Sequence, residues 1–352
     1  MLRRDLNNKL FVAVLGSVLV IFLAGVSVVL LGNVWYLAGA EEDVVTAKCG
    51  SCGYVYDGVT GYPEQDIPPG TSWLEHMGEW KCPSCGAGRE QFEEVVVKKD
   101  GWDILRDGLR NPENHFAIKL SIVSAAITAA LSMLVAIPAA YVLSRYRLPL
   151  GRLIDTVLDL PIVVPPPVMG ISLLIFFITP AGAFVIAHTP GWFVAAVNKL
   201  LTVLLGHEIN DGANWVFTTR GIILAQFCVA CSFGVRAVKA SFDTIGRRHE
   251  DVARTLGCTR RQAFFRVVLP MARTGIVAGF VMTWARAIAE FGPILFFCQA
   301  TQWKTEVMPI AMFLNFSVGR VEQAIALVLI MIAISLVTLL TFKKLGGQGY
   351  LW

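Results

Sequence analysis

The sequence predicts an all-α membrane protein with six transmembrane helices, interrupted by one small polar segment that contains four cysteines. The first observation behind this prediction is composition, because 55% of the 352 residues are hydrophobic and only 16% are charged, far from the balance of soluble domains. The second is the presence of six apolar windows of about 20 residues, the length needed to cross hydrocarbon. The third is a pair of C-x-x-C-G motifs within the polar segment.

The predicted spans occupy residues 10–32, 118–143, 157–179, 219–241, 273–298 and 323–342. Basic residues precede the first window, as in a signal peptide, but its apolar run is too long for one and predicts a retained span. The segment 180–218 is also apolar, yet Pro180, Pro190 and Gly206 interrupt it. We predict a short interfacial or re-entrant helix at 192–205, because a further crossing would reverse the sides of all later loops.

Loop charges predict the orientation of the spans. Residues 1–9 and 144–156 each carry a net charge of +2, and residues 236–273 hold nine basic against three acidic side chains. The positive-inside rule therefore predicts a multi-pass protein of the inner (cytoplasmic) membrane, with both termini and these loops in the cytoplasm. The segment 41–116, with 15 acidic and seven basic residues, is then predicted to be extracytoplasmic.

The cysteines of this segment give the strongest chemical signal. By composition, residues 41–48 are an acidic linker, 49–95 a small domain, and "KKDGWDILRDGLRNPENHF" a polar, partly amphipathic return to the second span. Gly53 and Gly86 follow the two C-x-x-C pairs and permit the positive φ of a turn whose backbone amides point at sulfur. Four thiolates suit tetrahedral iron or zinc, and a disulfide framework is the alternative in an oxidising compartment.

The stretch "CGSCGYVYDGVTGYPEQDIPPGTSWLEHMGEWKCPSCGAGREQFEEV" resembles rubredoxin along its whole length. The CGYVYD start, the DIPPGT segment, the Trp before CPSCGA and the terminal Phe stand where that family has them, whereas His76-Met77 replaces its usual Leu-Pro pair. The resemblance implies a small β-rich domain inserted after the first helix, with one iron that cycles between ferric and ferrous forms. The implied iron ligands are Cys49, Cys52, Cys82 and Cys85. The implied aromatic core is Tyr54, Tyr56, Trp73, Trp80 and Phe92.

Two roles remain open for such a centre. One is a structural staple, with zinc as the alternative ion, for a domain too small to fold on its core alone. The other is redox chemistry, and we hypothesise that the domain senses the external redox state and biases the membrane part through its tethers to the first two spans. The remaining cysteines, which lie in or beside apolar spans, are expected to be packing residues.

The loop after the fourth span carries the second signal. In "HEDVARTLGCTRRQAFFRVVLPMARTGIVAG", acidic and small residues at helical spacing precede a break at Gly257, and a basic amphipathic segment follows and ends at Leu269-Pro270. Two short helices around a glycine would form a rigid knob suited to docking. The loop closely resembles the EAA motif of ABC importer permeases, whose coupling helix sits in a groove of the ATPase subunit, although Asp-Val stands here where Ala-Ala is usual. The resemblance implies an ATPase-coupling loop at 241–270, with the residues Glu250, Asp251, Ala253, Gly257, Leu269 and Pro270.

Further stretches resemble the same permeases. "AIPAAYVLSRYRLPLGRLID", "LDLPIVVPPPVMGISLLIF" and "RAIAEFGPILFF" are similar to successive segments of type I permeases for molybdate, tungstate and sulfate. The resemblance covers about 116–343 and implies a type I architecture, with the first helix at 1–40, the rubredoxin-like domain at 41–98 and the permease domain at 99–352. It also implies a second permease copy, ABC ATPase subunits, and an extracytoplasmic binding protein that delivers an oxyanion. Molybdate or tungstate is preferred over sulfate on family analogy alone.

Prolines and two charges mark a candidate translocation pathway. Pro165, Pro166 and Pro167 break backbone hydrogen bonding inside the third span, which lipid tolerates only where protein or water satisfies the freed groups. Arg286 and Glu290 are four residues apart in the fifth span and can pair on one helix face. Charges inside a bilayer are functional candidates by default, and a purely structural ion pair is the alternative.

Several function classes find no support in the sequence. It contains no G-x-x-x-x-G-K-[ST] motif, so we expect no nucleotide on this chain and ATP hydrolysis on a separate subunit. No Ser/His/Asp signature is present and the five histidines are scattered, so we expect a transport subunit without catalytic residues. Cytoplasmic loops explain the net charge of +4, so no nucleic-acid partner is expected. The rival class is a membrane-anchored rubredoxin-type electron-transfer protein, which would need a redox partner but no docking loop.

Overall fold

The computed structural model places most of the chain. The residues it describes are Ser17, Val20, Ala24, 27–56, Gly58, Tyr62, Gln65, Ile67, Thr71, Trp73, 81–146, 151–206, 208–209, 211–212 and 214–346. Contacts divide the chain into one unit of Met1–Pro112 with Asn315–Ile330 and another of Glu113–Leu314 with Met331–Trp352.

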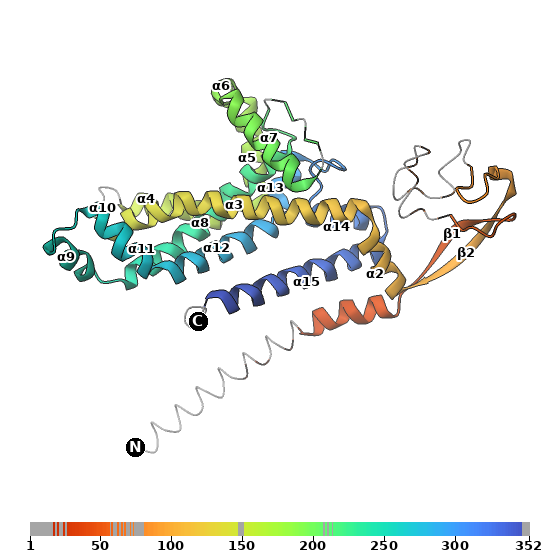
Figure 1. Ribbon diagram of the computed structural model, residues 1–352, viewed down its shortest axis with the longest axis horizontal. Coiled ribbons are helices and arrows are strands. Elements are labelled where there is room, and N and C mark those ends of the chain that lie inside the picture. Colours follow the sequence, from red (N-terminus) through yellow and green to blue (C-terminus); the bar gives the residue numbers. More distant parts are fainter. Residues whose placement is uncertain are drawn as a thin grey trace, which may run out of the picture. The chain divides into compact units, whose positions relative to one another are not determined.

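The first unit contains an antiparallel ribbon of β1 (Glu41–Cys49) and β2 (Phe92–Asp100), preceded at its second strand by the 3-10 turn η2 (Arg89–Gln91) (Figure 1). The register runs from Glu41 opposite Asp100 to Cys49 opposite Phe92. The predicted acidic linker 41–48 is therefore wrong. Its valines and threonine favour an extended backbone, and pairing with the valines of β2 outweighs its acidic composition.

The base of the ribbon packs on helices of the same unit. The predicted amphipathic return is α2 (Gly101–Arg110), and its N-cap Asp100 accepts a hydrogen bond of 2.8 Å from the backbone N–H of Asp103. Ile104 of α2 is buried with Leu37 of the helix Ser27–Ala38 and with Ala326 of α15 (Val321–Gly346). Since α15 contributes its first residues to this unit and the rest to the second, it belongs to both.

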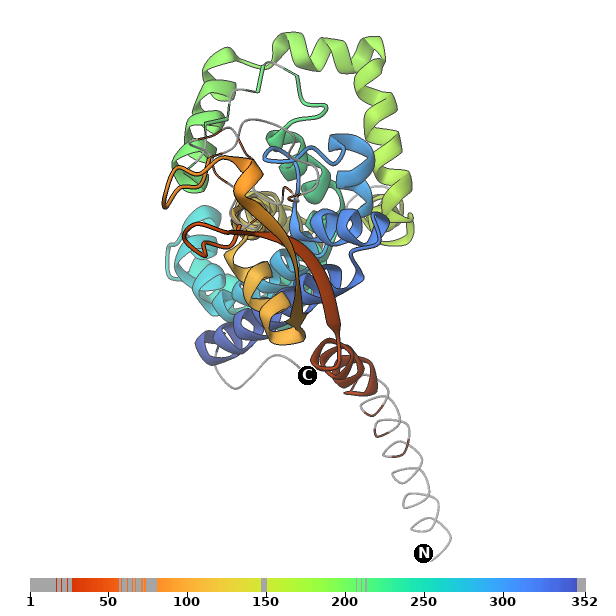
Figure 2. The same ribbon diagram turned by 90° about the vertical axis from the view of Figure 1, so that its right-hand side faces the viewer.

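The second unit is helical, and Figures 1 and 2 show α3, α8 and α12 running side by side. Its remaining elements are α3 (Pro112–Arg145), α4 (Gly151–Val163), α5 (Pro166–Ile178), α6 (Pro180–His188), α7 (Gly191–Leu205), α8 (Thr219–Thr244), α9 (Arg248–Thr255), α10 (Arg260–Ala263), the π-helical turn η3 (Phe264–Val268), α11 (Leu269–Met271), α12 (Arg273–Ile288), α13 (Gly292–Cys298) and α14 (Met308–Ser317).

Small residues bring α12 and α8 close together. A Cβ atom built on Gly275 of α12 would lie 2.1 Å from the Ser241 Oγ of α8, and one on Gly279 would lie 2.9 Å from Val238 Cγ2. Such spacing of small residues lets helix backbones approach in a membrane. Polar side chains join the same core, because Gln226 of α8 donates a 3.0 Å hydrogen bond to the Ala287 carbonyl of α12.

Hydropathy and length identify three helices in the described part of the chain as able to cross a membrane alone, and up to six crossings if each bent helix pair is one span. The unbroken helices Pro112–Arg145, Thr219–Thr244 and Val321–Leu340 match the second, fourth and sixth predicted spans. In place of the third predicted span, the helices Leu153–Val163 and Pro166–Ile178 are bent by 107° at the prolines. The fifth predicted span begins with the helix Arg273–Ile288, which the preceding helix Arg260–Met271 meets at 69°. Most of the first predicted span, 10–32, lies outside the described residues.

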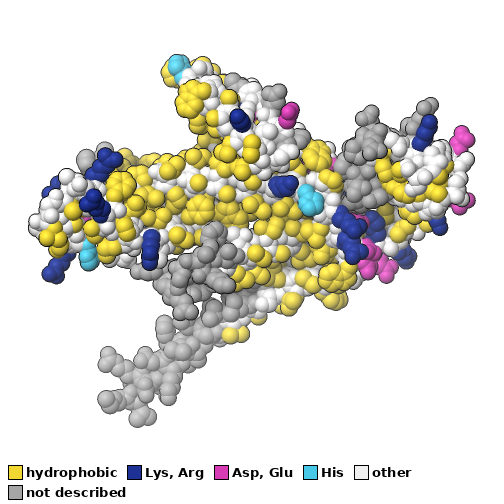
Figure 3. Space-filling view, viewed as in Figure 1, with side chains coloured by type: hydrophobic (Ala, Val, Ile, Leu, Met, Phe, Trp, Pro, Cys, Tyr) yellow, Lys and Arg dark blue, Asp and Glu magenta, His cyan; other side chains and the backbone are white. Residues whose placement is uncertain are grey.

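The segment between the third and fourth predicted spans forms α6 and α7, which meet at 80° beside Pro190. The helix expected at 192–205 corresponds to α7. The end of α7 packs against α3 and α8, because Leu201 and Leu205 share one buried cluster with Leu120 and Ile222. In the space-filling view hydrophobic side chains cover the length of α3, and Lys and Arg gather where α9 and α10 lie (Figure 3).

Candidate functional site

Four cysteine sulfurs converge at the end of the ribbon. The Sγ atoms of Cys49, Cys52, Cys82 and Cys85 all lie within 4.8 Å of one another, at 3.7 Å for Cys49 and Cys85 and 3.6 Å for Cys52 and Cys82. A tetrahedron with metal–sulfur bonds of about 2.3 Å has edges of about 3.8 Å, so these thiols can hold one tetrahedral ion. All eight cysteines, each in the described part of the chain, are free, and the geometry favours a metal over disulfides.

The two C-x-x-C motifs fold into matching turns. The Gly53 N–H donates to the Cys49 carbonyl and the Gly86 N–H to the Cys82 carbonyl, each at 2.8 Å. The φ angles of Gly53 and Gly86 are +76° and +74°, values that glycine adopts without a Cβ clash. Cys82 also donates its backbone N–H to the Ala87 carbonyl at 2.9 Å. Repetition of one turn thus aims both pairs of sulfurs at one point.

Each motif buries its first cysteine and exposes its second. Cys49 and Cys82 are buried, whereas Cys52 and Cys85 are exposed. Desolvation raises the pKa of the Cys49 thiol, but hydrogen bonds from the backbone amides of Cys52 and Ser51 lower it, to about 7 overall. Desolvation and the neighbouring sulfurs raise the pKa of the Cys52 thiol, so in the metal-free domain the thiolate is favoured at Cys49 and not at Cys52. The exposed sulfurs bring such a centre to the surface of its domain.

The aromatic core of this domain contains most of the residues that the sequence indicates. Tyr56 and Trp73 are buried with ring centroids 5.4 Å apart, and Phe92 stacks on Trp73 at 5.2 Å. Tyr54 packs at the edge of the cluster, and Trp80 lies outside the described residues. Ala47, Tyr62 and Ile67, which no sequence pattern indicated, also belong to the cluster.

The loop after α8 forms the expected knob. α9 ends at Thr255, Gly257 has a φ of +91°, and α10 begins after Thr259. Thr259 and Gln262 form a capping box, in which the Thr259 N–H donates to Gln262 Oε1 at 2.9 Å. Leu256 is 81% exposed. The knob therefore has a fixed backbone and an apolar side chain directed to its outside.

The two neighbouring acids of the knob have different surroundings. Asp251 is exposed, whereas Glu250 is partly buried and pairs with Arg145 at the end of α3. Tyr141 of α3 also donates a 2.9 Å hydrogen bond to Glu250 Oε2. Ala253 is the buried residue of α9. Of the coupling residues expected in α9, only Asp251 is thus fully available to a partner.

The end of the knob differs from the expectation that the basic segment stops at Leu269-Pro270. Helical backbone continues through η3 and α11, and Pro270 lies at the start of α11. A proline cannot donate to the carbonyl four residues earlier, and a π-helical turn directly before it accommodates the missing bond. Leu269 is half-buried and Pro270 is exposed.

The prolines of the third predicted span lie at the junction of α4 and α5. Pro165 is the N-cap of α5, which packs on α13. A Cβ atom on Gly170 would lie 2.7 Å from the Pro293 Cα, and one on Gly292 would lie 2.9 Å from the Pro167 Cγ. Each helix thus places a proline against a glycine of the other, a contact that the sequence analysis missed.

The two charges of the fifth predicted span form the expected pair. Arg286 Nη1 lies 2.5 Å from Glu290 Oε1, with 1% of the Glu290 side chain exposed. The Arg286 guanidinium also lies 5.7 Å from the Phe233 ring centroid. Glu290, between α12 and α13, thus pairs with an arginine in the last turn of α12.

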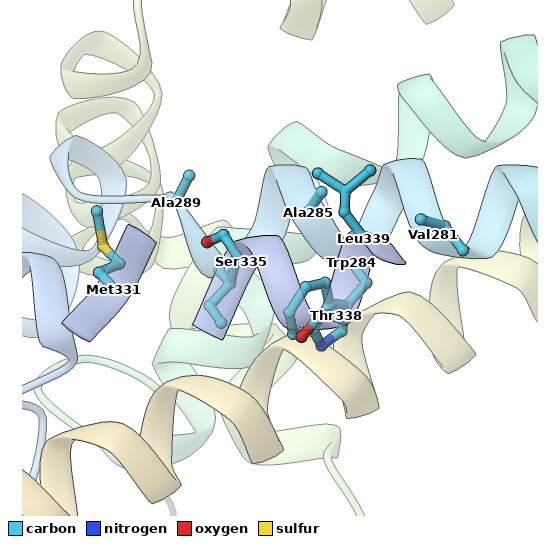
Figure 4. A pocket seen from close by; sticks show the side chains of 9 residues that line it. Val281, Trp284, Ala285, Ala289, Met331, Ser335, Thr338 and Leu339 are labelled. Atoms are coloured by element: carbon cyan, nitrogen blue, oxygen red, sulfur yellow. The ribbon is translucent and has the colours of Figure 1, made fainter. Parts of the chain in front are cut away.

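A cavity of about 150 Å³ separates α12 from α15 (Figure 4). Trp284 and Val281 line it from α12, and Met331 and Leu339 from α15. Its nine lining side chains carry no charge. This cavity suits an apolar group and not an anion.

A buried arginine that the sequence analysis missed stabilises the loop before α8. Arg220, 1% exposed, donates to the Asn214 carbonyl at 2.9 Å and also to the Gly212 carbonyl. Asp211 of this loop pairs with Lys304 at 3.0 Å. A basic residue at the start of an apolar span is the signal that could have identified Arg220 as a residue that holds this loop.

Family models match both parts of the chain. The model described as binding-protein-dependent transport system inner membrane component matches residues 122–345, and the rubredoxin model matches residues 46–92. Among solved structures, a bacterial ABC transporter involved in the import of alginate matches with a TM-score of 0.53 at 18% identity, covering 70% of this chain and 84% of that chain. This likeness shows the permease fold.

Curated relatives are permeases. A sulfate transport system permease protein of Salmonella typhimurium is 29% identical over 72% of this chain and 84% of the relative. A molybdate/tungstate permease of Thermococcus kodakarensis is 29% identical over 70% and 86%, and a molybdenum permease of Mycobacterium tuberculosis is 31% identical over 70% and 84%. The chain belongs to the family of inner membrane components of binding-protein-dependent transport systems, and it carries a rubredoxin domain at residues 46–92.

Proposed function

We propose that this chain is the permease subunit of an ATP-driven ABC importer for an oxyanion, with molybdate or tungstate preferred over sulfate. The observation that carries the proposal is the outer face of the knob, where Asp251 and Val252 of α9 and Leu256 at its C-cap are exposed. Contacts of Glu250 with α3 fix the backbone from the inner side. Exposed apolar side chains on a rigid element suit a protein partner. The family membership and the anions named for the three relatives support the transport role and the substrate class.

The proposed assembly follows from this role. Two copies of the chain form the pathway by alternating access, ATPase subunits dock on the knob in the cytoplasm, and a binding protein delivers the anion from outside. Residues 1–40 are the first helix, 41–98 the rubredoxin-like domain outside the cytoplasm, and 99–352 the permease domain. Pro165, Pro166 and Pro167 form a wall of the pathway with α13, and the pair of Arg286 and Glu290 lies at the α12–α13 junction beside it.

Copurification tests the docking role. The Leu256→Asp variant places a charge on the proposed contact, whereas Leu109→Asp changes a leucine of similar surface character on α2, 47% exposed. After coexpression with the cognate ATPase, we expect the first variant to lose the ATPase and the second to retain it. Equal recovery with both variants, or no recovery with the wild type, would refute the docking role and favour the rival electron-transfer protein.

Uptake measurements test the substrate. Vesicles that contain the permease and its ATPase, with binding protein outside, are offered labelled molybdate, tungstate or sulfate in turn. We expect ATP-dependent uptake of molybdate or tungstate that excess sulfate inhibits poorly. Preferential sulfate uptake would overturn the preference within the group and leave the oxyanion class standing.

We further propose that the cysteine centre holds one iron, with Cys49, Cys52, Cys82 and Cys85 as ligands. The sulfur spacing and the rubredoxin match support it. Iron bound by four thiolates supplies one-electron chemistry. The purified protein should show the visible absorption of ferric iron, bleached by dithionite and absent in Cys82→Ser. A colourless, zinc-loaded protein would make the centre a structural staple.

We also propose a redox-sensing role for this domain, favoured by the cluster of Leu37, Ile104 and Ala326 at the base of the ribbon. β1 has nine residues, which span about 30 Å at about 3.4 Å per residue. That length exceeds the Debye length of about 10 Å at 0.1 M salt, so the charge of the centre cannot act on α15 through its field. The ribbon itself has to carry the signal to the start of the last span.

The redox role has a direct test. ATPase rates of the assembled transporter are compared before and after dithionite, with zinc-substituted protein as the control that cannot change its redox state. We expect the iron form to change its rate and the zinc form to stay constant. Equal rates in both redox states of the iron form would refute redox sensing.

A further inference from the structure

Glu250 lies on the inner side of the docking knob, away from the face proposed for the ATPase. Its side chain is 15% exposed, and its Oε1 accepts from Arg145 Nε while its Oε2 accepts from the Tyr141 hydroxyl at 2.9 Å. Both partners come from the last turns of α3, more than 100 residues earlier in the chain. Both carboxylate oxygens are therefore used within this chain.

Arg145 also binds the end of α8. Its Nη1 donates to the Phe242 carbonyl at 3.1 Å and its Nη2 to the Ile245 carbonyl at 2.9 Å, where α8 ends. The Phe242 carbonyl also accepts the Ile245 N–H at 3.2 Å, so the guanidinium adds a second donor there and meets the negative end of the helix dipole. One guanidinium thus joins the ends of α3 and α8 to the beginning of α9.

The Tyr141 ring fixes the other helix of the knob. Its centroid lies 4.6 Å from the Phe264 ring, at the start of η3, and 5.8 Å from the Phe242 ring. α9 through Glu250 and η3 through Phe264 are therefore held by the same turn of α3. Arg247 adds a 2.6 Å hydrogen bond to the Arg145 carbonyl.

We propose that Tyr141, Arg145 and Glu250 form a latch that transmits movement of the docked knob to α3 and α8. These are positioning residues, and the inference rests on the proposed docking of an ATPase at the outer face of α9. A force applied to α9 reaches the end of α3 through two charge-assisted contacts. α3 carries it inward, since Thr128 of α3 bonds Gln226 of α8 at 3.0 Å and Gln226 bonds the Ala287 carbonyl beside Arg286.

The test measures coupling separately from docking. The coexpressed permease and ATPase are purified and reconstituted, and three quantities are recorded: ATPase recovered per permease, the rate of hydrolysis, and ATP hydrolysed per anion transported. Glu250→Gln removes the charge of the latch and Tyr141→Phe removes only its hydroxyl. Tyr146→Phe is the matched control, because the ring of Tyr146 lies 6.5 Å from Tyr141 but its hydroxyl takes no part in the latch.

We expect both latch variants to bind the ATPase as the wild type does. The ATPase assembled with them should hydrolyse at least about fivefold more ATP per anion, which is the lower end of the fold-changes typical of coupled sites. The control should keep the wild-type ratio. If the three residues had a merely structural role, ATPase recovery, hydrolysis and transport would fall together and the ATP hydrolysed per anion would stay unchanged. That result overturns the latch. A wild-type value of ATP hydrolysed per anion in Tyr141→Phe and Glu250→Gln also overturns it. If Leu256→Asp leaves the ATPase bound, the docking proposal fails instead.

Discussion

Gly257 sets the turn of the docking knob at the scale of a single residue. Its φ of +91° is a conformation that L side chains rarely adopt, although no described atom lies within 4 Å of an added Cβ. Gly257→Ala should therefore cost about 1–2 kcal/mol of backbone strain without any steric clash. We expect less ATPase to copurify with this variant and ATP-dependent transport to fall several-fold.

Gly246 provides the control for that experiment. It lies in the same loop with no described atom near an added Cβ, and its φ is outside the left-handed region. Gly246→Ala should leave transport unchanged. If both variants behave alike, the strained turn is not what positions the knob.

Cys82 is the residue-scale test of the metal centre. Because the domain has only a small core, loss of one ligand should release the metal and unfold the domain. We expect Cys82→Ser to contain no iron and to be cleaved by protease within residues 41–100, while Cys258→Ser retains wild-type iron content and resistance. Protease resistance of metal-free Cys82→Ser would show that the core suffices for folding.

Residue-level prediction from the sequence succeeded where partners are close in the chain. The i, i+4 interval identified the pair of Arg286 with Glu290, and C-x-x-C spacing identified the two sulfurs of each motif, because local geometry alone brings these groups together. The resemblance to rubredoxin was needed to join the two motifs, which are 30 residues apart. The resemblance to the EAA motif included Glu250 among the coupling residues without indicating which way its side chain faces. Within this chain Glu250 contacts Tyr141 and Arg145 of another helix, and no local pattern indicates such a contact.

At the scale of elements, the crossing of α5 and α13 shows what hydropathy cannot find. A window of apolar residues has the same mean hydropathy whether its helix is straight or bent, so the third span was expected as one helix. Three consecutive prolines lack the N–H groups that would continue α4 into α5, and the chain turns by 107°. Similarly, β1 escaped prediction because the residues that pair with it lie between 43 (Cys49 to Phe92) and 59 (Glu41 to Asp100) positions later in the chain.

This crossing makes a prediction about stability. An added methyl group on Gly292 would lie 2.9 Å from the Pro167 ring, and overpacking of this kind costs about 1–3 kcal/mol. Gly292→Ala should lower both the thermal unfolding temperature of the purified permease and its transport rate. Gly191→Ala, where no described atom lies within 4 Å, is the control. An unchanged unfolding temperature in Gly292→Ala would contradict the close packing of α5 and α13.

At the scale of the whole molecule, the orientation drawn from loop charges can be tested on cells whose outer barriers have been removed. A membrane-impermeant protease should cut within residues 41–116, and an impermeant thiol reagent should reach Cys258 only after the membrane is opened. Labelling of Cys258 in sealed cells, with protection of 41–116, would reverse the proposed orientation.

ATP-dependent anion uptake by the reconstituted transporter tests the proposed transport function. Vesicles with the permease and its ATPase are supplied with binding protein outside, ATP inside and labelled molybdate or tungstate. We expect uptake that requires both ATP and binding protein, and loss of uptake in Leu256→Asp. Absence of ATP-dependent uptake for molybdate, tungstate and sulfate alike, in vesicles whose ATPase remains bound, would contradict it.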